Sequence, residues 1–72
     1  MAKAKAELRV SGLAKPGLVR SVEESLSGVE GVEYIHVNLG AGRVTIEYDD
    51  SVTKVEAFIT LVNRVGCDAV LE

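Results

Sequence analysis

The sequence predicts a small α+β domain in which four strands and two helices follow in the order βαββαβ. Two observations predict it: strand-like and helix-like apolar patterns alternate in that order, and the second half of the chain nearly repeats the first. A shift of 36 residues superimposes Leu8 on Val44, Val10 on Ile46, Val19 on Val55, Val22 on Phe58, Leu26 on Val62 and Val29 on Val65. Two equal βαβ halves are typical of a ferredoxin-like sandwich, with a four-stranded antiparallel sheet and both helices on one face.

The first half of the chain is predicted to form a strand, a loop and a helix. Polar and apolar residues alternate over residues 7–11, as in a half-buried strand, and a loop follows over residues 12–15. Pro16 suits the first position of a helix because it has no N–H to leave unsatisfied. Apolar residues then recur at helical spacing over residues 16–27, and Gly28 marks the end of that helix.

A β-hairpin is predicted at the centre of the chain. Strands over residues 32–39 and 43–48 are separated by residues 40–42, where glycine supplies the positive φ of a tight turn. Alternation directs one set of side chains toward the helices and the other toward water. The water-facing set is predicted to be Glu7, Arg9, Tyr34, His36, Asn38, Thr45 and Glu47. This face is polar enough to remain uncovered.

The last part of the chain is predicted to form a helix and a short strand. Thr53 and Glu56 have the spacing of a capping box. In this motif the threonine side chain accepts a hydrogen bond from the backbone N–H of the glutamate, and the glutamate side chain accepts one from the backbone N–H of the threonine. We therefore expect the second helix to start at Thr53. Gly66 ends this helix, and residues 68–71 form the final strand.

Length, composition and charge limit the classes of function. The chain has 72 residues, of which 47% are hydrophobic and 26% charged, so we expect one globular domain over residues 7–72 after a flexible N-terminus at residues 1–6. The net charge of −3 and the lack of a basic run argue against a nucleic-acid partner. No apolar stretch approaches the roughly 18 residues of a membrane span, and no apolar segment follows the cationic N-terminus as a secretory signal would require, so we expect neither. We expect a cytoplasmic location without membrane insertion.

An ordered set of core and turn segments runs through the chain. It comprises Val10-Ser11-Gly12-Leu13, Val19, Val22-Glu23, Leu26, Gly31-Val32, Val37-Asn38-Leu39, residues 42–49, Gly66 and Ala69. In this order and spacing, residues 7–71 resemble the heavy-metal-associated domain family, which includes copper chaperones, the mercuric-ion carrier and N-terminal modules of copper-transporting ATPases. The resemblance implies the ferredoxin-like fold, a role in copper-type metal transport or homeostasis, and a protein partner such as a metal transporter or chaperone domain.

The metal-binding motif of that family is missing. Its loop usually reads Gly-Met-x-Cys-x-x-Cys, whereas the corresponding stretch here reads Gly12-Leu13-Ala14-Lys15-Pro16-Gly17-Leu18. Lys15 and Leu18 therefore occupy the two cysteine positions. Cu(I) and Hg(II) require thiolate or thioether sulfur, which neither side chain offers. We expect no metal at these positions and no cofactor, and we interpret the chain as a metal-independent docking or regulatory module.

A docking surface is predicted around the same loop. Its residues are Leu13, Lys15, Leu18 and Cys67. Lys15 is either a solvated lysine or a fixed positive charge that imitates the metal-loaded state. Leu18 either extends the apolar face of the first helix or adds an exposed apolar contact. Acidic residues around that helix form either a solvated face, paired as Arg20 with Glu24, or a surface for a basic partner. These acidic residues are Glu23, Glu24, Glu30 and Glu33.

Cys67 is the single cysteine, so no internal disulfide forms. The resemblance implies that Cys67 lies in a loop beside the metal loop, near Lys15, whose ammonium would favour the thiolate. One interpretation is a half-buried side chain that fills the loop. The alternative is a metal carrier, in which Cys67 holds Cu(I) between two chains or with sulfur from a partner. A monomer or a weak homodimer is expected accordingly.

Other function classes receive less support from the motifs. The chain contains no Ser-His-Asp set, no carboxylate–histidine constellation and no phosphate-binding glycine loop before a helix, so we expect no enzymatic activity. The stretch Lys15-Pro16-Gly17-Leu18 also resembles the Pro-Gly-x-Leu turn of ACT domains. These domains share the topology, dimerise and bind amino acids as allosteric effectors. An ACT-like regulatory domain is therefore the alternative from a different family.

Overall fold

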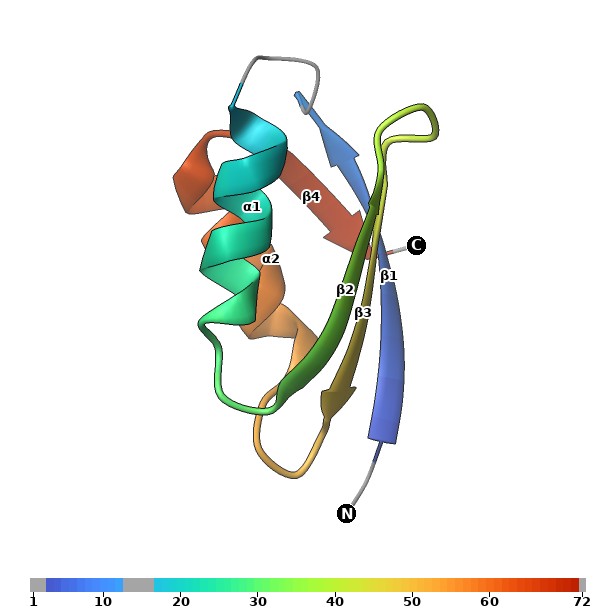
Figure 1. Cartoon of the computed structure of the whole chain (residues 1–72), viewed down its shortest axis with the longest axis vertical. Coiled ribbons are helices and arrows are strands. Elements are labelled where there is room, and N and C mark those ends of the chain that lie inside the picture. The colour runs from blue at the N-terminus through green and yellow to red at the C-terminus, as the bar shows by residue number, and fades with distance from the viewer. Residues whose placement is uncertain (1–2, 13–16, 72) are drawn as a thin grey trace.

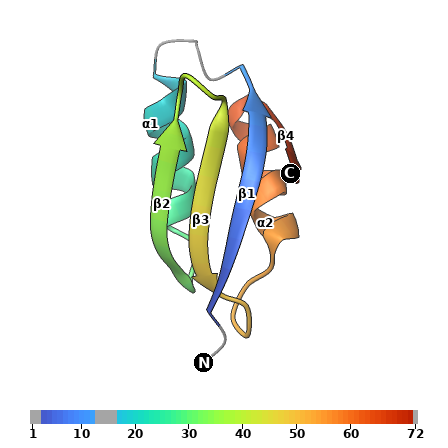
Figure 2. The ribbon, with the colours of Figure 1, turned by 90° about the vertical axis from the view of Figure 1, so that its right-hand side faces the viewer.

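The computed structural model of the chain describes residues 3–12 and 17–71 (Figure 1). The elements are β1 (Lys3–Ser11), α1 (Leu18–Ser27), β2 (Val32–Asn38), β3 (Arg43–Asp49), α2 (Val55–Val65) and β4 (Asp68–Leu71). The strands pair antiparallel in the order β2-β3-β1-β4, and both helices cover the same face of the sheet (Figures 1 and 2). The predicted ferredoxin-like sandwich is confirmed. No helix within the described ranges is long and apolar enough to cross a bilayer.

The hydrophobic core lies between the sheet and the two helices. Its largest fully buried side chains are Phe58, Leu8, Leu26, Ile46, Val22, Val44 and Val62. Four of the six residue pairs superimposed by the 36-residue shift are buried at both positions, which confirms the repeat as a pattern of core residues. The Phe58 ring meets the Tyr48 ring edge-on, with centroids 4.9 Å apart and planes at 80°. Such a pair adds about 0.5–1.5 kcal/mol beyond the area it buries.

The strand β1 starts earlier than predicted. It pairs with β3 from the Lys3–Asp49 position to the Arg9–Arg43 position. Residues 3–6 therefore belong to the strand, and the flexible N-terminus expected over residues 1–6 does not include them. The inward alternation continues through two alanines, whose small side chains give a weak apolar signal in the sequence. The second of them, Ala6, is buried.

The start of α2 also differs from the prediction. The helix begins at Val55, the preceding Lys54 has extended backbone angles, and no side chain caps the helix. The prediction of a capping box between Thr53 and Glu56 was therefore wrong. The Thr53 backbone N–H donates to the Asp49 carbonyl oxygen at 3.1 Å, and its side chain is buried. Thr53 therefore belongs to the turn after β3, where it cannot cap α2.

The hairpin and the open face of the sheet follow the prediction closely. β2 ends at Asn38, one residue early, because Leu39 enters the turn and is exposed. The turn closes with Gly42 at φ 65°, and the Asn38 side-chain oxygen accepts a hydrogen bond from the Ala41 N–H at 3.2 Å. A bulge between Val32 and Tyr34 interrupts the pairing of β2 with β3. Figure 2 views the sheet from the face that the helices leave uncovered.

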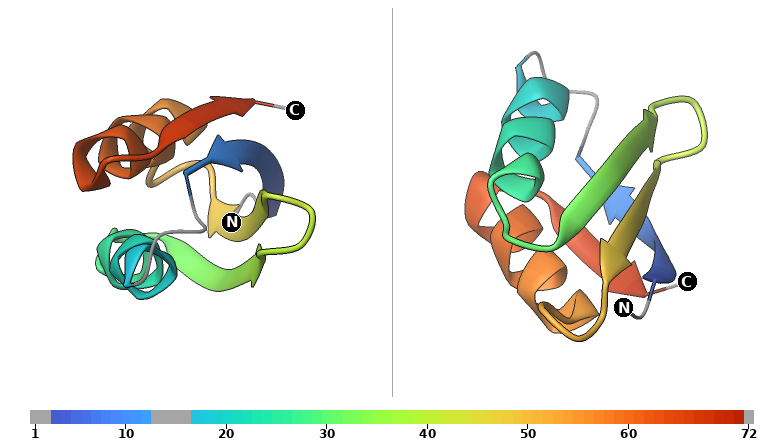
Figure 3. Two further views of the ribbon diagram at one scale, coloured as in Figure 1. Left: turned by 90° about the horizontal axis from the view of Figure 1, so that it is seen from above. Right: turned by 60° about the horizontal axis from the view of Figure 1, so that its bottom comes forward.

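The helices are distributed over the sheet so that each lies beside one edge strand. α1 contacts β2, α2 contacts β4, and the two helices contact each other. Viewed along the long axis, this gives one layer of helices and one layer of strands (Figure 3). The two ends of α1 therefore border different parts of the surface.

Candidate functional site

The two described residues of the predicted docking surface, Leu18 and Cys67, lie toward the end of the fold where β1 ends and α1 begins (Figure 1). We call this region the β1–α1 end and define it by residues 11–12, 17–18 and 66–67. Leu13 and Lys15 lie outside the described residues. Leu18 is the first residue of α1, and Cys67 lies in the connection between α2 and β4.

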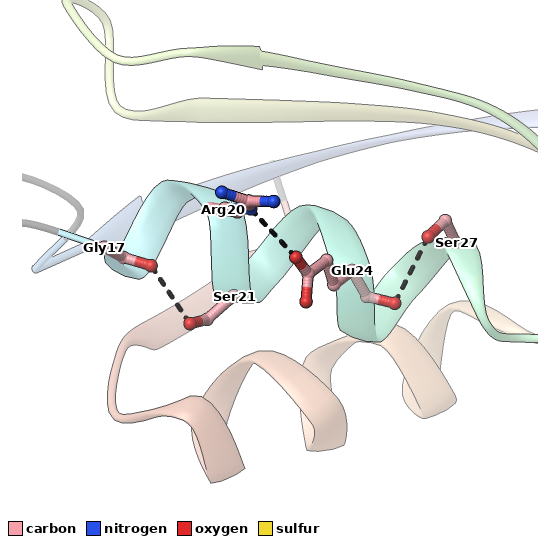
Figure 4. A network of polar contacts seen from close by, with 5 residues as sticks. All are labelled: Gly17, Arg20, Ser21, Glu24 and Ser27. Carbon is pink, nitrogen blue, oxygen red and sulfur yellow. Dashed lines mark hydrogen bonds and ion pairs between the residues drawn. The ribbon is translucent and has the colours of Figure 1, made fainter.

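Glycines shape the backbone on both sides of this region. Gly12 and Gly17 have φ angles of 92° and 83°, a conformation that disfavours any residue with a Cβ atom. The helix α1 begins at Leu18, later than the expected start at Pro16, which lies outside the described ranges. The Gly17 carbonyl oxygen accepts hydrogen bonds from the backbone N–H and the hydroxyl of Ser21, both at 3.0 Å (Figure 4). These bonds fix the first turn of α1.

Leu18, which the resemblance aligns with the second family cysteine, is partly buried. It is the first residue of α1 and packs against the hydrophobic core. The interpretation in which it extends the apolar face of the helix therefore agrees with its position. Its hydrocarbon side chain has no lone pair for a metal ion. A role for its exposed part in docking stays a prediction.

Cys67 is more deeply buried than expected. Its exposed fraction is 3%, and it belongs to the hydrophobic core as a free cysteine. Its backbone N–H donates to the Val62 carbonyl oxygen at 3.3 Å. A Cβ atom built on Gly12 would lie 3.8 Å from the Cys67 Cα and 4.0 Å from its Sγ. Cys67 thus packs beside the end of β1, where it contributes packing and almost no exposed surface.

The donors available for a soft metal ion are few. The sequence holds two sulfur atoms, in Met1 and Cys67, and Met1 lies outside the described residues. Within residues 3–12 and 17–71, no three His, Cys, Asp or Glu side chains gather into a group that could hold a metal ion. A buried thiol on its own does not provide the two or more sulfur ligands that Cu(I) prefers.

The polar face of α1 carries the predicted ion pair. The Arg20 Nε lies 3.0 Å from the Glu24 Oε1, and both side chains are mostly exposed (Figure 4). The Glu24 carbonyl oxygen also accepts a hydrogen bond from the Ser27 hydroxyl at 3.2 Å. An exposed pair of this kind contributes about 0.3–0.5 kcal/mol, so it supports the interpretation of a solvated helix face.

A groove between α1 and β2 was missed by the sequence reasoning. It has a volume of about 310 Å³ and is lined by Glu23, Ser27, Val32, Glu33, Tyr34 and Ile35. It forms only when the second half of α1 packs beside the first half of β2, so no contiguous motif marks it. The acidic residues around the first helix could have indicated this groove, because two of them, Glu23 and Glu33, line it.

Comparison with known proteins identifies relatives along most of the chain. Residues 7–67 match the family model of the heavy-metal-associated domain. The copper chaperone CopZ of Bacillus subtilis is 33% identical over 61 residues, which cover 85% of this chain and 88% of CopZ. A copper-exporting P-type ATPase of Staphylococcus saprophyticus is 36% identical over 64 residues, or 89% of this chain, but this chain spans only 8% of the ATPase.

A solved structure shows the same fold. The oxidised form of MerP from Ralstonia metallidurans superimposes with a TM-score of 0.92, and the alignment covers 99% of both chains. The two sequences are 22% identical, so this likeness concerns the fold alone.

Proposed function

This chain belongs to the heavy-metal-associated domain family, and from that membership we propose that it serves copper-type metal handling as a docking or regulatory module that works without a bound metal. Its partner would be another protein of the same process, such as a metal-transporting ATPase or a chaperone domain. The relatives that support this are a copper chaperone and a copper-exporting ATPase.

One observation carries the metal-independent part of the proposal. The single cysteine of the chain is 3% exposed inside the hydrophobic core. A thiol in this position reaches neither a second chain nor a partner's sulfur unless the local packing opens. Leu18, at the position of a family cysteine, packs against the core instead. Carriage of Cu(I) by Cys67 therefore receives no support from the packing.

The proposed docking surface comprises Leu13, Lys15 and the exposed part of Leu18. In this proposal, the Lys15 ammonium supplies a permanent positive charge where the family carries a metal ion. Complementary charge accelerates encounter between partners and fixes their relative orientation. Docking would then be permanent and would not depend on a bound metal. Cys67 supports this surface through its packing beside Gly12.

The amino-acid-binding alternative is set aside, because family membership accounts for the whole of residues 7–67. Several earlier expectations are kept as part of the proposal. They are a cytoplasmic location, no enzymatic activity, no nucleic-acid partner, and a monomer or weak homodimer.

The docking proposal is tested by titrating the domain with the metal-free N-terminal domain of a copper-exporting ATPase, in the presence of a Cu(I) chelator. We expect saturable binding, which Lys15→Ala weakens by about 1.4- to 5-fold, the range for one exposed ion pair. Lys54→Ala is the matched control, because it removes the same charge beside the start of α2. Binding that requires Cu(I), or that both variants weaken equally, would contradict the proposal.

A further inference from the structure

We propose that the groove between α1 and the free edge of β2 is a docking site for an extended basic peptide, which adds to the sheet as a fifth strand beside β2. The groove borders the second half of α1, whereas the β1–α1 end borders its start (Figure 1). The inference therefore goes beyond the proposed function and does not depend on it.

The first support is the position of β2 in the sheet. β2 is the terminal strand of the order β2-β3-β1-β4, and no strand in the described part of the chain pairs with its outer edge. Residues 34–38 keep a regular register with β3 on the inner edge, so this part of β2 has the regular pairing that a template strand needs. The outer edge of such a strand presents backbone donors and acceptors that an extended peptide can satisfy.

The second support is the shape of the surface next to that edge. Glu23 and Ser27 lie one helical turn apart and form the wall contributed by α1. Val32 and Ile35 are half-buried and provide apolar floor on the strand side. A peptide along β2 would direct alternate side chains into this groove, as expected for strand addition.

The third support is charge, which selects the kind of peptide. Glu23 and Glu33 are among the residues that line the groove, and none of the lining residues is basic. Glu33 is 3.3 Å from the Lys3 Nζ in an exposed ion pair, which a ligand displaces at little cost. Tyr34, 52% exposed, offers an aromatic face to an ammonium or guanidinium. Lysine and arginine side chains therefore fit both features.

The same charges argue against a second copy of this chain as the occupant. Two β2 strands paired across a twofold axis would bring the carboxylates of both grooves into one interface. Like charges in such an interface repel one another. The bulge at Glu33 also shortens the regular part of the edge. A partner of opposite charge avoids the repulsion.

The binding test uses fluorescence anisotropy with a labelled peptide of alternating lysine and threonine that matches β2 in length. We expect saturable binding to the intact domain and none to the corresponding glutamate–threonine peptide. The double variant Glu23→Gln/Glu33→Gln should weaken binding by about 2- to 30-fold, the range for two exposed ion pairs. The control Glu7→Gln/Glu56→Gln makes the same change in net charge on β1 and α2 and should leave the affinity unchanged.

The mapping test follows backbone amide chemical shifts of the labelled domain during the titration, which also verifies that each variant is folded. We expect the largest changes in residues 32–38 and at Glu23 and Ser27. Equal loss of affinity in the two double variants, or shifts confined to other elements, would overturn the proposal. The absence of lysine-peptide binding, or a concentration-dependent dimer formed through β2, would overturn it as well.

Discussion

Replacement of Gly31 by alanine is expected to destabilise the domain by about 2–5 kcal/mol. Gly31 has φ 96°, and its carbonyl oxygen accepts a hydrogen bond from the Asp49 N–H at 2.8 Å. A Cβ atom at this position would lie 2.9 Å from both the Cβ and the Cγ1 of Val52, closer than real Cβ contacts allow. The residue thus joins the connection before β2 to the turn after β3.

The magnitude combines two terms. A residue with a side chain in this backbone conformation costs about 1–2 kcal/mol, and overpacking against Val52 costs about 1–3 kcal/mol more. A domain of 72 residues has a total free energy of unfolding of roughly 4–11 kcal/mol. Gly31→Ala should therefore remove a large share of the stability, which urea unfolding followed by circular dichroism measures as a lower transition midpoint.

A matched control separates the two terms. Gly66 has φ 116°, and no described atom lies within 4 Å of the Cβ that alanine would add. Gly66→Ala should therefore show the backbone term alone, about 1–2 kcal/mol. Adding Val52→Ala to Gly31→Ala removes the Cγ1 contact and keeps the Cβ contact, so it should recover part of the overpacking loss. Equal effects of the two glycine substitutions, with no recovery in the double variant, would refute this reasoning.

Three further predictions concern the core, the only thiol and the start of α2. Phe58→Ala should lower the free energy of unfolding by about 3–5 kcal/mol, because the ring is fully buried against Tyr48. A measured loss below about 1 kcal/mol would show that the core is packed differently. Cys67 should react with a thiol reagent more slowly in the native protein than in urea, by at least an order of magnitude, and equal rates would contradict its burial. Glu56→Ala should change the free energy of unfolding by no more than about 0.5 kcal/mol, because no side chain caps α2. A loss of about 1 kcal/mol or more would show that Glu56 does take part in a capping box.

The fold was predictable because the core positions stand in a repeated apolar pattern. The pairs Val22–Phe58 and Leu26–Val62 occupy the same helical positions in both halves and are all buried. Element starts were less predictable, since tertiary contacts decide them. Thr53 has the local sequence of a helix cap, yet the turn after β3 holds its backbone and buries its side chain.

The candidate site was predictable only in part. The sequence shows directly that the chain lacks a second cysteine, and the resemblance implied that Cys67 lies near the loop after β1. Packing beside Gly12 agrees with that position, but the depth of burial was not foreseen. A loop cysteine and a core cysteine have the same local sequence. The groove beside β2 required the three-dimensional arrangement, because its residues come from two separate segments.

The most direct test of the metal-independent role is an anaerobic Cu(I) titration against a competing chelator, performed on the intact chain and on Cys67→Ala. If the role is metal-independent, neither protein withdraws Cu(I) from the chelator, and the mass in solution does not change on addition of the ion. Saturable binding by the intact chain that disappears in Cys67→Ala would contradict it. The buried thiol would then act as a metal ligand, and the domain would be a carrier.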